Sequence, residues 1–179
     1  PCLQLTNVGN LKIFRSIFTN ILFPSLSTVN NNIQIEYTYL DSLNFEALTD
    51  VQDIQIGPYN GFQNGLGTNF SINTFNSLVS MADLRIEQNH AQPWSGGYSA
   101  GLLSISGFNS LQQLSQLEVD DNIHLNSCCK LLDLASVANS TITINNNGSN
   151  CSSLVGTYNS CCPTTGCTDP VAINYNDSA

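Results

Sequence analysis

A five-point pattern of apolar residues recurs along this chain of 179 residues and constrains its fold more than any other feature. The pattern has the form F-x-x-L-x-x-h-x-x-h-x-h, where h is an apolar residue. Copies begin at Phe45, Phe75 and Phe108, an imperfect copy begins at Phe23, and a degenerate one ends at Ile144. Three copies in one register rarely arise by chance, so we predict that the chain is built from repeats.

Each copy combines two apolar periods. The F-x-x-L-x-x-h part recurs every three residues, which predicts a short helical or 3₁₀ segment that buries one stripe. The final h-x-h alternates with period two, which predicts a short strand with two inward side chains. One unit cannot bury its own apolar edge, so we expect the units to stack as a repeat solenoid with a parallel β-ladder. The predicted strands are Leu3–Leu5, Ile33–Ile35, Ile54–Ile56, Leu84–Ile86, Leu117–Val119 and Ile142–Ile144.

A shorter phrase, h-x-S-h, lies between the predicted strands. It occurs at Leu40–Leu43, Leu102–Ile105 and Leu125–Cys128. Its recurrence between strands predicts a second side to each coil.

The charge balance excludes some classes of partner. The chain has 13 acidic and 4 basic side chains, and its net charge is −9. It has no basic patch to neutralise phosphates, so we expect no nucleic-acid partner. An anionic membrane surface would repel the chain, and no run of 18 apolar residues is present to insert into a bilayer.

The seven cysteines favour an oxidising compartment, so we expect the protein to be secreted or at the cell surface. Cys2 lies near the first predicted strand, too far along the ladder to reach the C-terminal group. The other six are expected to form a disulfide-stapled C-terminal cap. Their pairing is open, since six cysteines allow 15 combinations. Four of them form the adjacent pairs Cys128–Cys129 and Cys161–Cys162, which lack the spacing of about two to four residues between the cysteine ligands of a zinc site, so we expect no metal. The six are Cys128, Cys129, Cys151, Cys161, Cys162 and Cys167.

Two loop insertions lengthen the repeat and are rich in glycine and aromatic residues. They span residues 57–70 and 87–100. Aromatic faces flanked by amides suit sugar rings, and loops on a rigid scaffold are common binding sites. The alternative is that these side chains fold back and pack on the repeats. The candidate ligand-binding residues are Tyr59, Phe62, His90, Trp94 and Tyr98.

A column of outward side chains follows from the predicted strands, because one residue lies between each pair of inward positions. Such a column is a candidate polar recognition surface. The alternative is an ordinary solvated ladder without a ligand. Its members are Gln34, Gln55, Arg85, Glu118 and Thr143.

Catalytic and metal-binding patterns are weak. A glycosidase needs two carboxylates at a set separation, and the column offers only Glu118, with Asp120 two residues on. We therefore predict a protein that is not an enzyme and has no cofactor. Calcium could bind weakly through oxygen ligands, although neither candidate set has EF-hand spacing. These sets are Asp120, Asp121 and Asn122, and Asp169, Asn174, Asn176 and Asp177.

Two stretches resemble known sequence patterns. The run Leu102-Leu-Ser-Ile-Ser-Gly-Phe-Asn-Ser-Leu111, followed by Leu117-Glu-Val119, Asp120-Asp-Asn122 and Leu125-Asn-Ser-Cys128, resembles bacterial receptor-L-domain-like leucine-rich repeat proteins. This resemblance implies a right-handed coil of α/β or mainly β composition. The tail Gly166-Cys-Thr-Asp-Pro-Val-Ala-Ile-Asn-Tyr-Asn176 resembles a G-C-T-D-P-x-A-x-N-Y-N motif of Bacteroidetes surface proteins. Together, the two resemblances imply a solenoid with a C-terminal cap over residues 1–162 and a truncated linker or motif over residues 163–179.

The sequence leads to three hypotheses about function. The first is a non-catalytic adhesion or binding module whose ligand is a glycan or an extracellular protein. The second is a rigid spacer without a ligand, and the third is a β-helix enzyme acting on carbohydrates. In each case neighbouring modules of the same polypeptide would be further partners.

Overall fold

The computed structural model describes residues 5–14, 20–36, 42–57, 70–88 and 101–161. Parallel β-sheet dominates this part of the chain, and the largest sheet has the strand order β1-β4-β6-β8-β10-β11, with β2 also paired to β4. The long strands therefore pair mostly in the order in which they occur in the chain. They are β1 (Asn7–Val8), β2 (Leu11–Phe14), β4 (Thr28–Glu36), β6 (Asp50–Ile56), β8 (Ser80–Glu87), β10 (Gln113–Asp120) and β11 (Ala138–Asn145).

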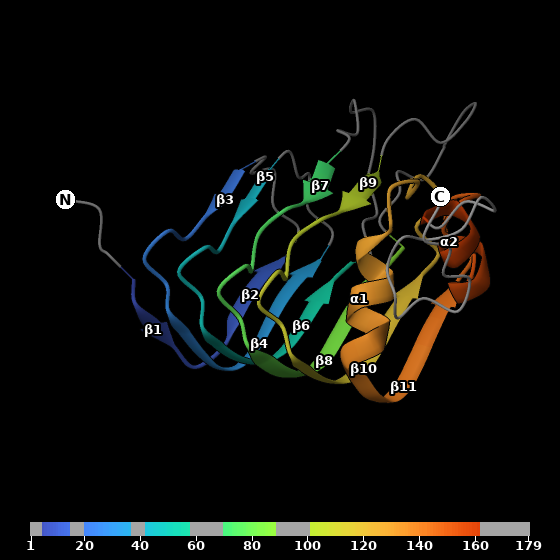
Figure 1. The fold of residues 1–179 in the computed structure, drawn as a ribbon. Helices are drawn as coiled ribbons and strands as arrows, with labels where there is room; N and C mark the ends of the chain where they lie inside the picture. Colours follow the sequence, from blue (N-terminus) through green and yellow to red (C-terminus); the bar gives the residue numbers. More distant parts are fainter. Residues whose placement is uncertain (1–4, 15–19, 37–41, 58–69, 89–100, 162–179) are drawn as a thin grey trace.

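Short strands form a second row across from the large sheet (Figure 1). They are β3 (Asn20–Leu22) paired with β5 (Ser42–Asn44), and β7 (Phe70–Ile72) paired with β9 (Leu102–Ile105). A parallel bridge between Ser104 and Ser127 continues this second row. The h-x-S-h phrase at Leu102–Ile105 therefore coincides with β9, and the repeats that end in β4, β6, β8 and β10 each consist of a short strand, a turn and a long strand.

The predicted register of the five later strands is confirmed. Equivalent apolar residues pair across each strand boundary, and all of them are buried in the core except Ile142 on the last strand, which is 39% exposed. A pleated strand turns alternate side chains to opposite faces, so these pairs stack as two inward columns. One column is Ile33, Ile54, Leu84, Leu117 and Ile142, and the other is Ile35, Ile56, Ile86, Val119 and Ile144.

The predicted opening strand is wrong. Residues 1–4 lie outside the described part, and Leu5 lies outside any strand. The first rung is β2, where Leu11 pairs with Ile33 and Ile13 with Ile35. The reason is visible in the spacing, because Cys2, Leu5, Val8, Leu11 and Ile13 have the same intervals as the copy that begins at Phe45. The chain therefore has one more copy of the pattern than the phenylalanines mark.

The predicted helical segment within each repeat is also wrong. The backbone N–H of Leu48 donates to the carbonyl of Phe45 at 3.1 Å, and Leu78 repeats this bond to Phe75 at 3.3 Å. A single bond of this kind closes a turn, and a long strand follows within two residues. In the copy that begins at Phe23, a register shift between Val29 and Asn32 accounts for its extra residue. In the regular copies, a turn followed by a long strand produces the same apolar period of three as a 3₁₀ segment.

A stack of phenyl rings fills the core beneath these turns. The ring centroids of Phe23 and Phe45 lie 5.4 Å apart, those of Phe45 and Phe75 5.0 Å, and those of Phe75 and Phe108 5.1 Å. The last two pairs are stacked within 17° of parallel. Phe75 and Phe108 adopt positive φ angles of 65° and 61°, which bulky residues rarely do. Burial of the rings therefore holds a backbone conformation that is unfavourable by itself.

Two helices and two disulfides close the far end of the sheet (Figure 1). Helix α1 (Lys130–Val137) precedes β11, and α2 (Leu154–Cys161) follows it. Cys128 pairs with Cys151 and Cys129 with Cys161, which confirms four members of the predicted cap. Cys2, Cys162 and Cys167 lie outside the described residues. Two disulfides fit an extracellular protein.

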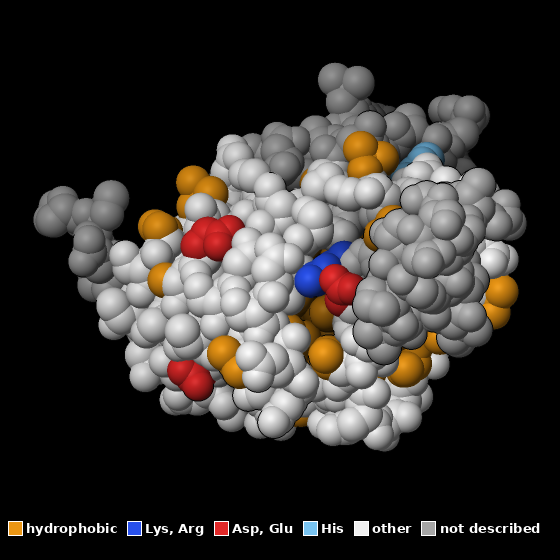
Figure 2. Space-filling model, in the orientation of Figure 1, with side chains coloured by type: hydrophobic (Ala, Val, Ile, Leu, Met, Phe, Trp, Pro, Cys, Tyr) orange, Lys and Arg blue, Asp and Glu red, His pale blue; other side chains and the backbone are white. Residues whose placement is uncertain are grey.

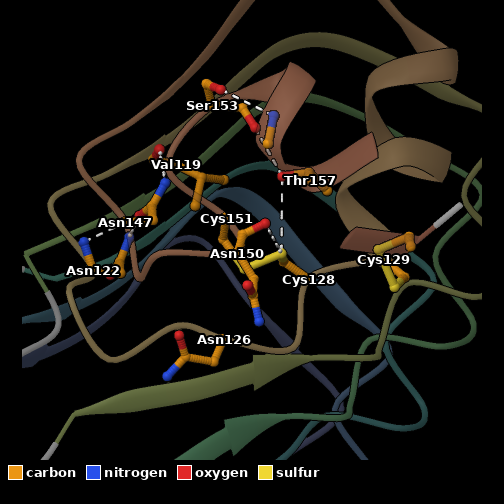
Figure 3. Close-up of a disulfide and its surroundings, with 12 residues drawn as sticks. Val119, Asn122, Asn126, Cys128, Cys129, Asn147, Asn150, Cys151, Ser153 and Thr157 are labelled. Carbon is orange, nitrogen blue, oxygen red and sulfur yellow. Dashed lines mark hydrogen bonds between the residues drawn. A yellow bond between two sulfur atoms is a disulfide. The ribbon is translucent and has the colours of Figure 1, made fainter. Parts of the chain in front are cut away.

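Adjacent cysteines let the two bonds hold both helices together. Cys128 and Cys151 are buried, and the Cys128 sulfur lies 3.8 Å from the hydroxyl of buried Thr157 on α2 (Figure 3). Cys129 directly precedes α1 and is bonded to the last residue of α2. In the ranges given above, neither eight-residue helix has the length or hydrophobicity that a membrane crossing requires.

Removing one ring from the stack is expected to destabilise the whole domain. Phe75→Ala leaves a cavity between two rings, and such changes typically cost about 3–5 kcal/mol of unfolding free energy. Chemical denaturation monitored by circular dichroism measures the loss. Val79→Ala is the control, because Val79 is 48% exposed and should change stability by about 0.5 kcal/mol or less. A loss below about 1 kcal/mol for Phe75→Ala would show that the stack does not support the fold.

Candidate ligand-binding face

The central outward positions of the long strands form one continuous row, which we call the central column. The strand pairings join Lys12 to Gln34, Gln34 to Gln55, Gln55 to Arg85, Arg85 to Glu118 and Glu118 to Thr143. The structure thus brings together all five residues that the sequence placed on this column. It adds Lys12, which sequence reasoning missed because it misplaced the opening strand.

Two flanking columns lie on either side of the central column, two residues away along each strand. Side chains two residues apart on a strand share a face, so the three columns together form one surface, the outward face. The first flanking column is Asn32, Asp53, Asp83, Gln116 and Thr141. The second contains Phe14 and Glu36, which pair with each other, and the paired series Glu87, Asp120 and Asn145.

A shallow depression of about 180 Å³ lies on the outward face where β4, β6 and β8 are adjacent. Ile33 and Ile54 contribute to its lining, although their side chains point into the core and are 0% and 1% exposed. Within it, the Gln34 amide donates to the Gln55 side-chain oxygen at 3.4 Å. Amides, carboxylates and the Arg85 guanidinium therefore make up the polar lining, whose other residues are Asn32, Asp53 and Asp83.

Arg85 is the cation at the centre of this surface. Its guanidinium lies 3.8 Å from an Asp83 carboxylate oxygen and 3.6 Å from one of Glu118. The three side chains are 42%, 33% and 28% exposed, so solvent screens both ion pairs and each stabilises the fold only slightly. Arg85 therefore remains available to exchange these contacts for contacts with a ligand.

Negative charge is in excess across the outward face. Its columns contain six carboxylates and two cations, Lys12 and Arg85. The carboxylates belong to Glu36, Asp53, Asp83, Glu87, Glu118 and Asp120. Elsewhere charge is sparse, and most of the described surface in the view of Figure 2 is neither charged nor hydrophobic.

Three carboxyl groups on the outward face have raised pKa values. Burial, and then the negative charge of Asp83, raise the pKa of Asp53 above its usual value. Burial, and then the charge of Glu118, raise the pKa of Glu87. For Asp120 the pKa is raised by burial and then by Asp121. The charged forms are thus disfavoured, and a bound cation or hydrogen-bond donor would relieve that cost.

Asn122, a candidate calcium ligand, has a structural role instead. Its side chain is buried, and its amide donates to the carbonyls of Ile86 at 2.8 Å and Asp120 at 2.9 Å. The Asn147 side-chain oxygen accepts from the Asn122 backbone, and the Asn147 amide donates to the Val119 carbonyl (Figure 3). The two asparagines thus satisfy backbone groups where the long strands end. Within the described ranges, no three acidic, cysteine or histidine side chains form a metal-sized group.

The remaining sequence candidates fall into two groups. Glu118 and Asp120 share a strand and a face, with Glu118 paired to Arg85. The loop residues Tyr59, Phe62, His90, Trp94 and Tyr98 lie outside the described part, and so do Asp169, Asn174, Asn176 and Asp177.

Comparison with known proteins adds no relative. No family model matches the chain, and no curated protein or solved structure is significantly similar to it. The function is therefore inferred from the geometry of the outward face.

Neutralising one crowded carboxylate is expected to stabilise the protein. A carboxyl whose pKa is raised by folding opposes folding once it ionises, so stability falls as pH rises from about 4 through the raised pKa. Asp53→Asn removes that charge and keeps the side-chain oxygen that accepts from the Asp83 backbone at 3.3 Å. Thermal unfolding should give a higher Tm than wild type at pH 7, with the difference shrinking as the pH falls to about 4.

The matched control is Asp50→Asn, at an exposed position where the side chain accepts a hydrogen bond from Thr49. This variant should not gain stability at pH 7. A Tm for Asp53→Asn at or below that of wild type at pH 7 would contradict the account of crowded charge.

Proposed function

We propose that the chain is a leucine-rich, receptor-L-domain-like solenoid that acts as a non-catalytic binding or adhesion module, secreted or at the cell surface. The observation that carries the proposal is the outward face, with six central positions in register from β2 to β11. A row of this kind offers a long, flat and rigid surface to an extended ligand. The ligand is an extracellular protein or a glycan.

Three features support the solenoid part of the proposal. Successive long strands pair in parallel, with equivalent residues side by side. The phenyl rings of successive repeats stack on one another in the same direction inside the core. The short strands form a second parallel row, which gives each repeat two sides. The last long strand is followed by a disulfide-bonded helical cap, as expected where a repeat array ends.

The chemistry of the outward face favours a protein segment with basic side chains over a sugar. Sugars bind by stacking on aromatic rings, and among the described residues of the three columns Phe14 is the one aromatic side chain. Carboxylates with raised pKa values gain most from a cationic partner. Lysine and arginine side chains would pair with Asp53, Asp83 and Glu87, while the amides of Gln34 and Gln55 bind backbone groups. A glycan would instead use the aromatic residues of the two loop insertions.

Binding arrays test this proposal. The purified protein is applied to an array of glycans and to immobilised extracellular peptides that differ in their number of basic residues. We expect retention on basic peptides that weakens with added salt, because the contacts are between exposed charges. The double variant Asp83→Asn/Glu118→Gln should weaken this binding by about tenfold, equivalent to about 1.4 kcal/mol.

Asp133→Asn is the matched control, because Asp133 is 70% exposed on α1, away from the outward face. It removes one charge and should leave binding within about twofold. Retention on glycans that depends on Trp94 and not on the outward face would move the site to the loops. Two blank arrays would overturn the binding proposal in favour of a spacer without a ligand.

A further inference from the structure

The two disulfides of the C-terminal cap differ in exposure. Cys128 and Cys151 are at most 1% exposed, whereas Cys129 is exposed and Cys161 is half-buried. Thiol–disulfide exchange requires a thiolate to reach one of the two sulfur atoms, so access controls its rate. A reductant in solution therefore reaches the Cys129–Cys161 bond, which we call the outer disulfide, before the Cys128–Cys151 bond, which we call the inner disulfide.

Helix α2 depends on these bonds more than α1 does. Leu131 and Leu134 of α1 are buried and belong to the core. Among the eight residues of α2, all of which the structure describes, Thr157 is the one that is buried, while Leu154 and Val155 are exposed. A helix of this length is marginal when it has no apolar face to bury. The outer disulfide, which ends at the last residue of α2, therefore supplies much of what holds α2 in place.

The inner disulfide lies beside α2. The Thr157 hydroxyl oxygen lies 3.8 Å from the Cys128 sulfur, and Figure 3 shows this side chain directed from α2 toward that sulfur. The same hydroxyl donates to the carbonyl of Ser153 at 3.0 Å, which fixes the first turn of α2 next to the inner disulfide. Movement of α2 would uncover the Cys128 sulfur. The outer disulfide thus protects the inner one by retaining α2.

We propose that the outer disulfide is a redox-sensitive attachment whose reduction releases α2 from the cap. A small dithiol supplies the two electrons. Its thiolate attacks the Cys129 sulfur, the bond between the two protein sulfurs breaks, and Cys161 leaves as a thiolate that takes up a proton. The second thiol of the reductant then displaces Cys129, which is protonated in turn, and the reductant becomes a cyclic disulfide. The protein gains two thiols, and the C-terminal end of α2 is freed.

The rest of the fold keeps its attachments when the outer disulfide alone is reduced. The inner disulfide still joins Cys128, which lies before α1, to Cys151, which lies before α2. Leu131 and Leu134 still hold α1 against the core, and β11 remains paired with β10. Reduction therefore acts locally on α2 and leaves the sheet folded. Exposed disulfides are the class that serves as labile or regulatory bonds, whereas buried ones are structural.

Reduction of the native protein tests the order of the two disulfides. The oxidised full chain is treated with dithiothreitol, its free thiols are alkylated at intervals, and tandem mass spectrometry of its peptides reports each cysteine separately. We expect Cys129 and Cys161 to be alkylated at least about tenfold faster than Cys128 and Cys151. Equal rates in the native protein, or a faster inner disulfide, would overturn the proposal.

The control for this order is the same reaction in denaturing guanidinium chloride. Unfolding exposes all four cysteines, so the two disulfides should then be reduced within about twofold of each other. A tenfold difference that persists in denaturant contradicts the proposal, because burial would not be its cause.

Hydrogen–deuterium exchange tests the release of α2. In wild-type protein with only the outer disulfide reduced, amides of Leu154–Cys161 should exchange faster than in oxidised protein, while amides of β8 and β10 should not change. Cys129→Ser/Cys161→Ser should reproduce this change and should let the inner disulfide be reduced about tenfold faster than in wild type. Exchange of α2 that is unchanged after loss of the outer disulfide overturns the proposal, and so does an unchanged inner rate in the double variant.

Val155→Ala is the matched control variant, because it alters an exposed side chain of the same helix and keeps both disulfides. It should leave both reduction rates as in wild type. An inner disulfide that this variant exposes to reduction as much as the double variant does would also contradict the role of the outer disulfide.

Discussion

The parallel stacking of equivalent apolar residues is the interaction on which the rest of the structure depends. Each repeat has two inward strand positions and one ring, and each is covered by the same position of the next repeat. A single repeat leaves its apolar edge exposed, so stability comes from neighbours rather than from any one unit. The positive φ at Phe75 and Phe108 persists because burial of the rings compensates for it.

The same register determines where chemistry can occur. Inward positions are occupied by the core, so functional side chains are restricted to the outward positions and to the loops. On the outward face, the translation that aligns the core also aligns Asp53 with Asp83 and Glu87 with Asp120. Burial is the main cause of the raised pKa values of Asp53 and Glu87, and the negative charges of Asp83 and Glu118 that the fold places nearby raise them further. A ligand with basic groups would pair with the carboxylates that the register brings close together.

Much of the sheet could be predicted from the sequence, because strand positions and register depend on an apolar pattern that is local and repeated. The turn at Phe45 could not be separated from a 3₁₀ segment, since both bury every third residue. The opening repeat was missed because Cys2 occupies the phenylalanine position. The disulfide pairing of Cys128 depends on how α1 and α2 fold against each other, and spacing alone does not determine that. The buried role of Asn122 likewise depends on distant carbonyls.

The stacked register is tested most directly by detecting contacts between successive phenyl rings in solution. Nuclear Overhauser effects can be recorded on protein with selectively labelled phenylalanine, with assignments from single Phe→Leu variants. The account predicts contacts from Phe45 to Phe75 and from Phe75 to Phe108, and none between Phe45 and Phe108, because one ring separates them. Absence of both neighbouring contacts, or a direct contact between Phe45 and Phe108, would contradict the stacked register.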